Sequence, residues 1–267
     1  MSKILLVITT YNQSEYTKLC FDSLKLLDDN FDVLVVDDYS SDDTVEICNQ
    51  YGYEVYTKDE PKGLTHSWNV GYERFKNKNY DYFIVANNDI LIPKGAISEL
   101  VNSFKKWPYS LIVPLSTTNG AGHNAQFQSV ENYYQGLSPD CNEPNNYQII
   151  QDKMLSVQEE VKKANNLYLL DTMRMKMFNG FFFMMNRNII NYEHSDNILF
   201  NPDYNMTKNE DKFNWNNLIP NNDFPAVCKT SFVFHFKGVS TFKIFDNYGE
   251  ISNNVPEWKK QRELYDK

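Results

Sequence analysis

Short runs of apolar residues alternate with segments of helical periodicity through the first 115 residues of the chain. The apolar runs have the length and the continuous hydrophobicity of strands buried on both faces of a parallel sheet. Between them, leucine and isoleucine recur at the three- and four-residue spacing of helices that pack one face against such a sheet. The alternation predicts right-handed βαβ units. The expected strands are 4–9, 33–37, 54–57, 82–86 and 110–114, and the expected helices are 14–27, 43–50, 64–76 and 94–106, with Ser14, Asp42 and Thr65 as candidate N-caps.

The pattern changes after Pro114. Residues 116–150 are rich in Asn, Gln, Gly, Ser and Pro, which predicts long loops. No linker separates the two halves, so we expect one domain over residues 1–267. Its first half, 1–115, has the element order of a nucleotide-binding unit, and 116–267 would form the other wall of a cleft. In the second half, helices are expected at 155–166, 208–218 and 257–265, and strands at 178–185 and 226–236.

Composition and charge exclude several classes of protein. The formal net charge of −9 argues against nucleic acid as the main partner, because binding its phosphates requires a basic face. The four cysteines are far apart and form no CxxC pair, which favours neither a zinc site nor a disulfide framework. We therefore expect a reduced, cytoplasmic protein, with peripheral membrane contact left open. The N-terminal apolar run reads as a strand rather than a signal peptide, and the later run 178–185 is too short to span a bilayer.

The strand at 82–86 ends in three polar residues, Asn87, Asn88 and Asp89. Ligands of open α/β sheets bind at the carboxyl ends of the strands. A carboxylate there is suited to hold a hard cation and, through it, a phosphate. The alternative is a polar turn in which Asp89 caps the helix after Pro93, and this residue alone does not distinguish the two.

The second expected strand also ends in acid, with Asp37 and Asp38. Adjacent carboxylates at a strand end can accept hydrogen bonds from a nucleobase N–H or a ribose hydroxyl. Helix capping accounts for Asp42 or Asp43 but does not require this pair. Neither GxGxxG nor GxxxxGK[ST] occurs, so a bound phosphate would need another counter-charge, which a metal on Asp89 would supply.

Taken in order, these and further motifs resemble the inverting family 2 glycosyltransferases of the GT-A fold. These enzymes move a sugar from a nucleotide diphosphate to an acceptor hydroxyl. The resemblance implies a three-layer α/β/α sandwich with a mainly parallel central sheet, a nucleotide-sugar-binding half over 1–115, and an acceptor-binding half with the catalytic base over 116–267. The matching pieces are Thr10-Tyr11-Asn12, Asp37 to Thr44, Gly63 with Asn69 and Gly71, Asn87-Asn88-Asp89, Asn179-Gly180-Phe181 with Arg187, Glu210-Asp211, and His235.

The resemblance also implies a role for each matched residue. Asp211 would be the general base and Glu210 its neighbour at the acceptor or sugar. Asp89 would hold Mn²⁺ or Mg²⁺, with His235 as a second metal ligand or a direct phosphate contact, although His235 in its aromatic strand also fits a core histidine. Nucleotide contacts would come from Thr9, Tyr11, Asp37, Asp38, Asn69, Asn87 and Asn88, and acceptor or sugar contacts from Asn179, Gly180, Phe181, Arg187 and Trp215.

Two departures from the family pattern carry their own predictions. Tyr39 stands where the family has glycine, so the loop there is expected to follow a different path. Asn87 replaces the first acid of the metal motif, which leaves Asp89 as the one carboxylate.

Gly71 lies inside an expected helix, where glycine is less stable than alanine by about 1 kcal/mol. A close approach of backbone or ligand is one reason for a glycine there, and chance is the other.

Alternative functions stay open on the sequence. A catalytically silent nucleotide-sugar-binding module fits the weakened metal motif. A nucleotidyltransferase fits poorly, because residues 9–13 lack a Gly-rich basic loop.

UDP-hexoses and dTDP-deoxysugars both suit the family as donors, and the "NND" form favours a rhamnosyltransferase-like branch. The acceptor, a glycan or another hydroxyl compound, and the oligomeric state are not readable. Tryptophans that could stack on sugars are Trp68, Trp107, Trp215 and Trp258.

Overall fold

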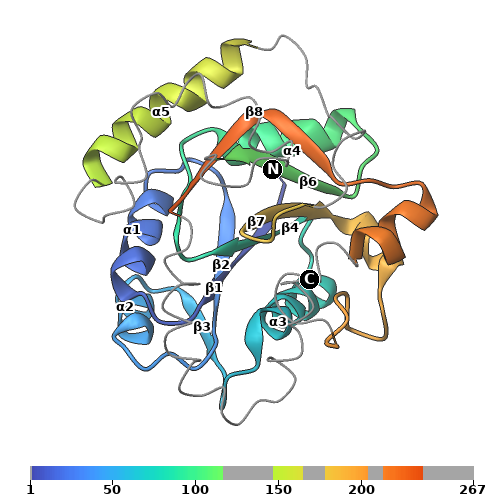
Figure 1. Cartoon of the computed structure of the whole chain (residues 1–267), viewed down its shortest axis with the longest axis horizontal. Coiled ribbons are helices and arrows are strands. Elements are labelled where there is room, and N and C mark those ends of the chain that lie inside the picture. The colour runs from blue at the N-terminus through green and yellow to red at the C-terminus, as the bar shows by residue number, and fades with distance from the viewer. Residues whose placement is uncertain (1, 117–146, 165–177, 204–212, 237–267) are drawn as a thin grey trace, which may run out of the picture.

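An α/β sheet with helices on both sides forms the protein (Figure 1). The computed structural model describes residues 2–116, 147–164, 178–203 and 213–236. The strand order is β3-β2-β1-β4-β7-β6-β8-β5. The strands are β1 (Ile4–Thr10), β2 (Phe31–Asp37), β3 (Glu54–Thr57), β4 (Tyr82–Asn87), β5 (Ile90–Leu91), β6 (Leu111–Ser116), β7 (Phe182–Asn186) and β8 (Ala226–His235).

The first four strands of the order, β3, β2, β1 and β4, are parallel neighbours, as the βαβ pattern predicts. Strand β7 is antiparallel to both β4 and β6, and β8 is again parallel to β6. The helices are α1 (Ser14–Leu24), α2 (Thr44–Gln50), α3 (Gly63–Asn77), α4 (Ala96–Lys106) and α5 (Tyr147–Ala164), with short helical turns at Arg187–Tyr192, Asn214–Leu218 and Ile219–Asn221. The α/β class predicted from the sequence is confirmed.

Each central strand contributes to two hydrophobic cores, one on either face of the sheet. On β1, Leu5 and Val7 belong to the same core as buried residues of α3 and α5, whereas Leu6 and Ile8 belong to the same core as those of α1 and α4. Successive side chains of a strand point to opposite faces, so a strand covered on both faces is apolar throughout. This explains the continuous apolar runs of the sequence.

Helix α3 lies unusually close to the sheet because of Gly71. A Cβ atom at this position would lie 2.8 Å from a methyl carbon of Val7 and 3.1 Å from the ring of Phe83. The glycine is therefore explained by close helix–sheet packing, and it needs no ligand nearby.

Several predicted boundaries in the second half were wrong. Helix α5 begins at Tyr147, within the segment expected to be loop, and it buries Ile150, Met154, Val157 and Val161 at helical spacing. The strand expected at 178–185 covers only Phe182–Asn186. Residues 208–212 and 257–265, both expected to be helical, lie outside the described residues.

Two of the predicted helix caps were also wrong. Ser14 and Thr65 lie inside their helices, because α1 begins after Gln13 and α3 after Lys62. Asp42 does accept a hydrogen bond from the amide of Thr44, the first residue of α2. Among the described residues, no helix has the length and hydrophobicity needed to cross a membrane.

Candidate active site at the carboxyl edge of the sheet

The strand register brings most of the predicted site residues to one edge of the sheet. Thr10, at the end of β1, is paired with Asp37, and Thr9 is paired with Asn87 at the end of β4. At the far end of β8, His235 is paired with Ile90, the residue after Asp89. Strand β7 runs in the opposite direction, so its first residues, preceded by 179–181, also reach this edge.

Asp89 and His235 form the centre of this edge. Asp89 is 2% exposed, and its backbone carbonyl accepts a hydrogen bond from the amide of Phe236. Nε2 of His235 lies 3.2 Å from Oδ1 of Asp89, without the geometry of a hydrogen bond. Within the described residues, that buried oxygen accepts no hydrogen bond. The juxtaposition predicted from positions far apart in the chain is therefore present in the structure.

The geometry at Asp89 fits a divalent cation. A buried carboxylate oxygen without a donor is unfavourable, and a cation would satisfy it. Carboxylate oxygen and imidazole nitrogen are both ligands of Mn²⁺, and Mg²⁺ prefers a site with few protein ligands. No group of three or more His, Cys, Asp or Glu side chains gathers anywhere in the described ranges. Any cation here would complete its coordination with water and with oxygens of a bound phosphate.

Phe181 orients the histidine instead of lining an acceptor site. Its ring stacks on that of His235, with 4.5 Å between centroids and 10° between planes. Phe181 is 1% exposed, so its predicted contact with an acceptor does not hold. The backbone carbonyl of Phe181 accepts a hydrogen bond from the amide of Asn87, which fixes the start of β7 to the end of β4. Asn179 and Gly180 precede it at the same edge.

The two asparagines before Asp89 have different surroundings. The side-chain amide of Asn88 is buried and donates to the carbonyl of Asn12 and to the hydroxyl of Thr17, at 3.0 and 2.8 Å. It anchors the loop after β1. Asn87 is half-buried, and its Oδ1 accepts a long hydrogen bond, 3.4 Å, from the hydroxyl of Thr9. Asn87 is thus the one of the pair that keeps an accessible side chain.

Asp37 holds the loop that follows β2. It is fully buried, and it accepts hydrogen bonds from the hydroxyl of Thr10 and from the amide and hydroxyl of Ser40. These contacts tie the end of β2 to the end of β1 and to the loop itself. The carboxylate is therefore already in use within the fold.

Asp38 caps helix α3 and neutralises a buried lysine. Its Oδ1 accepts from Nζ of Lys58 at 2.7 Å and from the amides of Lys62 and Gly63. The Lys58 ammonium also donates to the carbonyl of Gly63 and the hydroxyl of Ser67. Burial lowers the pKa of Lys58, an effect that Asp38 opposes. Lys58 was not among the residues predicted from the sequence, although a lysine directly after a strand and beside an acidic loop is an available signal.

The backbone at Tyr39 corrects the prediction for its loop. Tyr39 has φ of 68°, the left-handed conformation that glycine adopts most readily, so the loop does not depart to suit the larger residue. The Tyr39 side chain is 53% exposed at the edge of the site. Nearby, burial and the charge of Asp38 raise the pKa of the Tyr11 hydroxyl.

Three predicted residues lie away from this edge or have other partners. The Asn69 side chain accepts hydrogen bonds from the backbone amides of Leu199 and Phe200 and donates one to the carbonyl of Phe200. It therefore connects α3 to the segment at residues 199–200 rather than facing a nucleotide. Trp68 is fully buried and cannot stack on a sugar.

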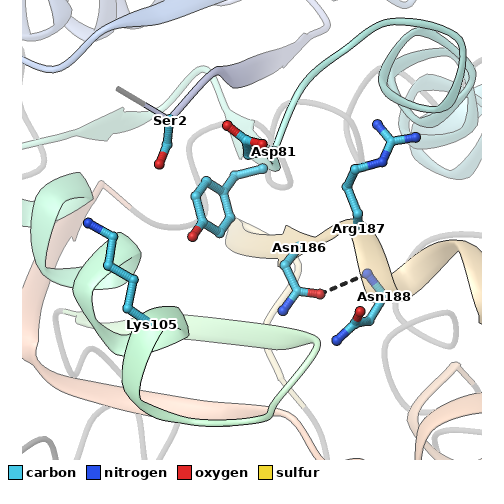
Figure 2. A pocket seen from close by; sticks show the side chains of 7 residues that line it. Ser2, Asp81, Lys105, Asn186, Arg187 and Asn188 are labelled. Atoms are coloured by element: carbon cyan, nitrogen blue, oxygen red, sulfur yellow. Dashed lines mark hydrogen bonds between the residues drawn. The ribbon is translucent and has the colours of Figure 1, made fainter.

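Arg187 follows β7, whose antiparallel direction carries it to the opposite edge of the sheet. Its guanidinium donates to the carbonyls of Lys78 and Tyr80, so its predicted acceptor contact does not hold. An open surface pocket lies at the same edge, where Lys105 and Arg187 extend from opposite sides (Figure 2). Its lining residues are Ser2, Asp81, Tyr82, Lys105, Asn186, Arg187 and Asn188.

Part of the predicted catalytic set is not described. Glu210 and Asp211 lie outside the described residues. Trp215 lies in the helical turn Asn214–Leu218, and its side chain is outside the description as well. The described residues therefore include those predicted to bind the nucleotide and the metal, but not the predicted catalytic base.

Comparison with known proteins gives a family and a fold. A sequence profile described as "Glycosyl transferase family 2" matches residues 5–192. No curated protein matches the chain. Among solved structures, S. aureus TarS 1-349 is 14% identical, with a TM-score of 0.58 over 87% of this chain and 60% of that one.

A second solved structure gives the same result. The mannosyltransferase PcManGT from Pyrobaculum calidifontis, in complex with GDP-Man and Mn²⁺, is 13% identical, with a TM-score of 0.55 over 90% of this chain and 59% of that one. S. aureus TarS 1-349 in complex with UDP-GlcNAc has a TM-score of 0.56 at 15% identity, over 89% and 61% of the two chains. At these identities the likeness shows the fold. The chain spans about three fifths of the length of these structures.

Proposed function

Because the chain belongs to glycosyl transferase family 2, as its motifs predicted, we propose that it transfers a sugar from a nucleotide diphosphate to an acceptor hydroxyl. The observation that carries the proposal is the carboxylate of Asp89 at the carboxyl edge of the sheet, buried and with an oxygen that the described residues leave without a donor. Sugar-nucleotide chemistry needs a diphosphate-binding centre, and a metal on this carboxylate would form one.

Asp89 and His235 would hold Mn²⁺ or Mg²⁺. When bound, the cation would neutralise the charge that grows on the departing nucleoside diphosphate. Phe181 packs flat on the His235 ring and so keeps its Nε2 directed at Asp89. Mn²⁺ is present with GDP-Man in the solved mannosyltransferase structure, which supports a divalent cation beside the sugar nucleotide in this chain.

The nucleoside would lie against the ends of β1 and β2. Asp38 retains the greater capacity for a ligand, because within the described residues its Oδ2 accepts only the amide of Gly63. Tyr11, raised in pKa and therefore protonated at neutral pH, would contribute a hydroxyl donor. Asn87, with its accessible amide, would contact the ribose or a water on the cation. Thr9 positions that amide.

We assign the acceptor side from the sequence motifs. Asp211 would accept the proton of the acceptor hydroxyl while that oxygen attacks the anomeric carbon from the face opposite the diphosphate, which inverts the configuration. Glu210 would bind the acceptor or the sugar, with Asn179, Gly180 and Trp215 nearby in the motif order. General-base catalysis contributes about 10²–10⁴-fold in rate. UDP- and dTDP-sugars are the proposed donors, including the deoxysugars of a rhamnosyltransferase-like branch, and the product would enter glycan synthesis.

A nucleotide panel followed by a base variant tests this function. UDP, dTDP and GDP with Mn²⁺ should each be titrated into the protein by calorimetry, and the matching sugar nucleotides assayed with a hydroxyl acceptor library. We expect one nucleotide to bind, its sugar to be transferred, and Asp211→Asn to bind it equally while losing at least about 100-fold in transfer. Equal inactivity of wild type and variant, with binding retained, would instead identify a silent sugar-nucleotide-binding module.

A further inference from the structure

Tyr39 occupies a backbone conformation that is unfavourable for its residue type. Its φ of 68° is left-handed, where the Cβ atom of a bulky residue crowds the following carbonyl. Glycine would adopt the same conformation without that cost. A residue held in such a conformation indicates a function for its side chain more often than chance.

A network of hydrogen bonds maintains this conformation. Asp37 accepts the amide of Ser40 at 3.0 Å and also its hydroxyl. The Ser40 oxygen accepts the amide of Asn12 at 2.7 Å, and Oδ1 of Asn12 accepts the amide of Ser41 at 2.8 Å. The residues on both sides of Tyr39 are thus fixed to β2 and to the loop after β1, and the strain at Tyr39 persists because its neighbours cannot move.

The Tyr39 ring has no role in holding the fold. It is 53% exposed, and among the described residues it makes neither a hydrogen bond nor a ring contact. Other tyrosines of the same half are in use: Tyr51 and Tyr53 pack on Phe21, and Tyr80 donates to Asp32. Tyr56 is similarly exposed, at 44%, but it lies on the edge strand β3, where an exposed ring needs no strained backbone.

We propose that Tyr39 is a stacking platform for the base of the bound nucleotide. The inference rests on the proposed function and deepens it. Tyr39 directly follows Asp38 at the carboxyl edge, so its exposed ring belongs to the same loop that would bind the nucleoside. Stacking on an aromatic ring suits any base, because every base has a π face. The rigid loop places the ring before the ligand arrives, which limits the ordering cost of binding.

Four ligands and three variants test the platform. A panel of UDP, dTDP and GDP first identifies the nucleotide that binds wild type. This nucleotide should then be titrated by calorimetry with Mn²⁺, alongside its monophosphate, its nucleoside and inorganic pyrophosphate. We expect Tyr39→Gly to bind the nucleotides and the nucleoside about tenfold more weakly, by the same factor for each, and pyrophosphate unchanged. Tyr39→Phe should keep wild-type affinity, and Tyr56→Ala is the control for loss of an exposed tyrosine.

Thermal unfolding provides a second readout, because Tyr39→Gly relieves the backbone strain. We expect its midpoint without ligand to equal or exceed that of wild type.

Unchanged nucleotide affinity in Tyr39→Gly would overturn the platform and leave the proposed function intact. An equal loss of pyrophosphate binding would also overturn it, because the effect would then arise from the loop. If wild type binds none of the three nucleotides, the proposed function itself fails.

Discussion

Two acidic strand ends at the same edge of the sheet differ in how their carboxylates are used. At the end of β2, Asp37 and Asp38 accept hydrogen bonds from a hydroxyl, a buried ammonium and several backbone amides. At the end of β4, Asp89 is also buried, yet within the described residues its Oδ1 accepts no hydrogen bond and lies beside the ring of His235. The first pair mainly holds loops and a helix in place, with Oδ2 of Asp38 proposed to contact the nucleoside as well, whereas the second carboxylate is left available for a ligand.

The contrast separates structural from functional acids by their hydrogen bonds rather than by their position. A buried charge that already has partners is destabilising to remove, because a partner is left uncompensated. A buried carboxylate whose partner is an absent ligand should be removable with little loss of stability. The following variants are ordered by the loss of folding free energy that this contrast predicts.

Asp38→Ala should give the largest loss, about 3–5 kcal/mol in the free energy of unfolding, because Lys58 would be left charged and buried. Urea denaturation measures it. The double variant Asp38→Ala/Lys58→Met should recover most of the loss, leaving about 1 kcal/mol for the missing cap of α3. A loss below about 1 kcal/mol in the single variant would show that Asp38 is not the structural carboxylate of the pair.

Asn69→Ala should cost about 1–3 kcal/mol, because the amides of Leu199 and Phe200 would lose their acceptor. Nucleotide affinity should be unchanged once the folded fraction is taken into account. Stability and calorimetric affinity should be compared on the same preparation. A fall in affinity without a fall in stability would restore Asn69 to the nucleotide site.

Glu54→Gln should cost less than about 1 kcal/mol, because its ion pair with Arg74 is exposed. The hydrogen bond from Arg74 lowers the pKa of Glu54, so its contribution is present above the ordinary glutamate pKa and is lost as the pH falls through the lowered value. Denaturation at pH 7 and pH 3 should therefore show a larger difference between wild type and variant at pH 7 than at pH 3. A difference of equal size at both values would assign the effect to something other than this charge.

Asp89→Asn should have the smallest effect on stability, within about 1 kcal/mol of wild type in the absence of metal, and in the stabilising direction if it differs. The substitution removes a buried charge that the described residues do not pair through a hydrogen bond. Denaturation in the presence of EDTA measures it. A loss as large as that of Asp38→Ala would place Asp89 among the structural acids.

The sequence was sufficient for the parallel half of the fold and for the convergence of Asp89 and His235. Buried parallel strands are apolar throughout, which makes the parallel half readable from local patterns, whereas the pairing of Asp89 with His235 was implied by the family resemblance. The amides of Asn69 and Asn88 were misread, because hydrogen bonds to distant backbone groups leave no local signal. The start of α5 was missed because polar residues in this segment outnumber the four buried apolar residues of the helix, Ile150, Met154, Val157 and Val161.

The errors at Arg187 and Tyr39 have different causes. Arg187 follows β7, and the sequence does not reveal that this strand runs antiparallel between β4 and β6. That direction alone moves the arginine to the other edge of the sheet. At Tyr39, the residue type predicted a changed loop, but hydrogen bonds from the amides of Ser40 and Ser41 to Asp37 and Asn12 hold the glycine-like conformation.

Metal-dependent nucleotide binding by wild type and Asp89→Asn tests the central claim most directly. The nucleotide that binds wild type should be titrated by calorimetry with Mn²⁺ and again with EDTA. We expect Mn²⁺ to raise the affinity of wild type by at least about tenfold, a difference of about 1.4 kcal/mol, and to leave that of Asp89→Asn unchanged. An equal response to Mn²⁺ in the variant would contradict the assignment of this carboxylate as the cation site.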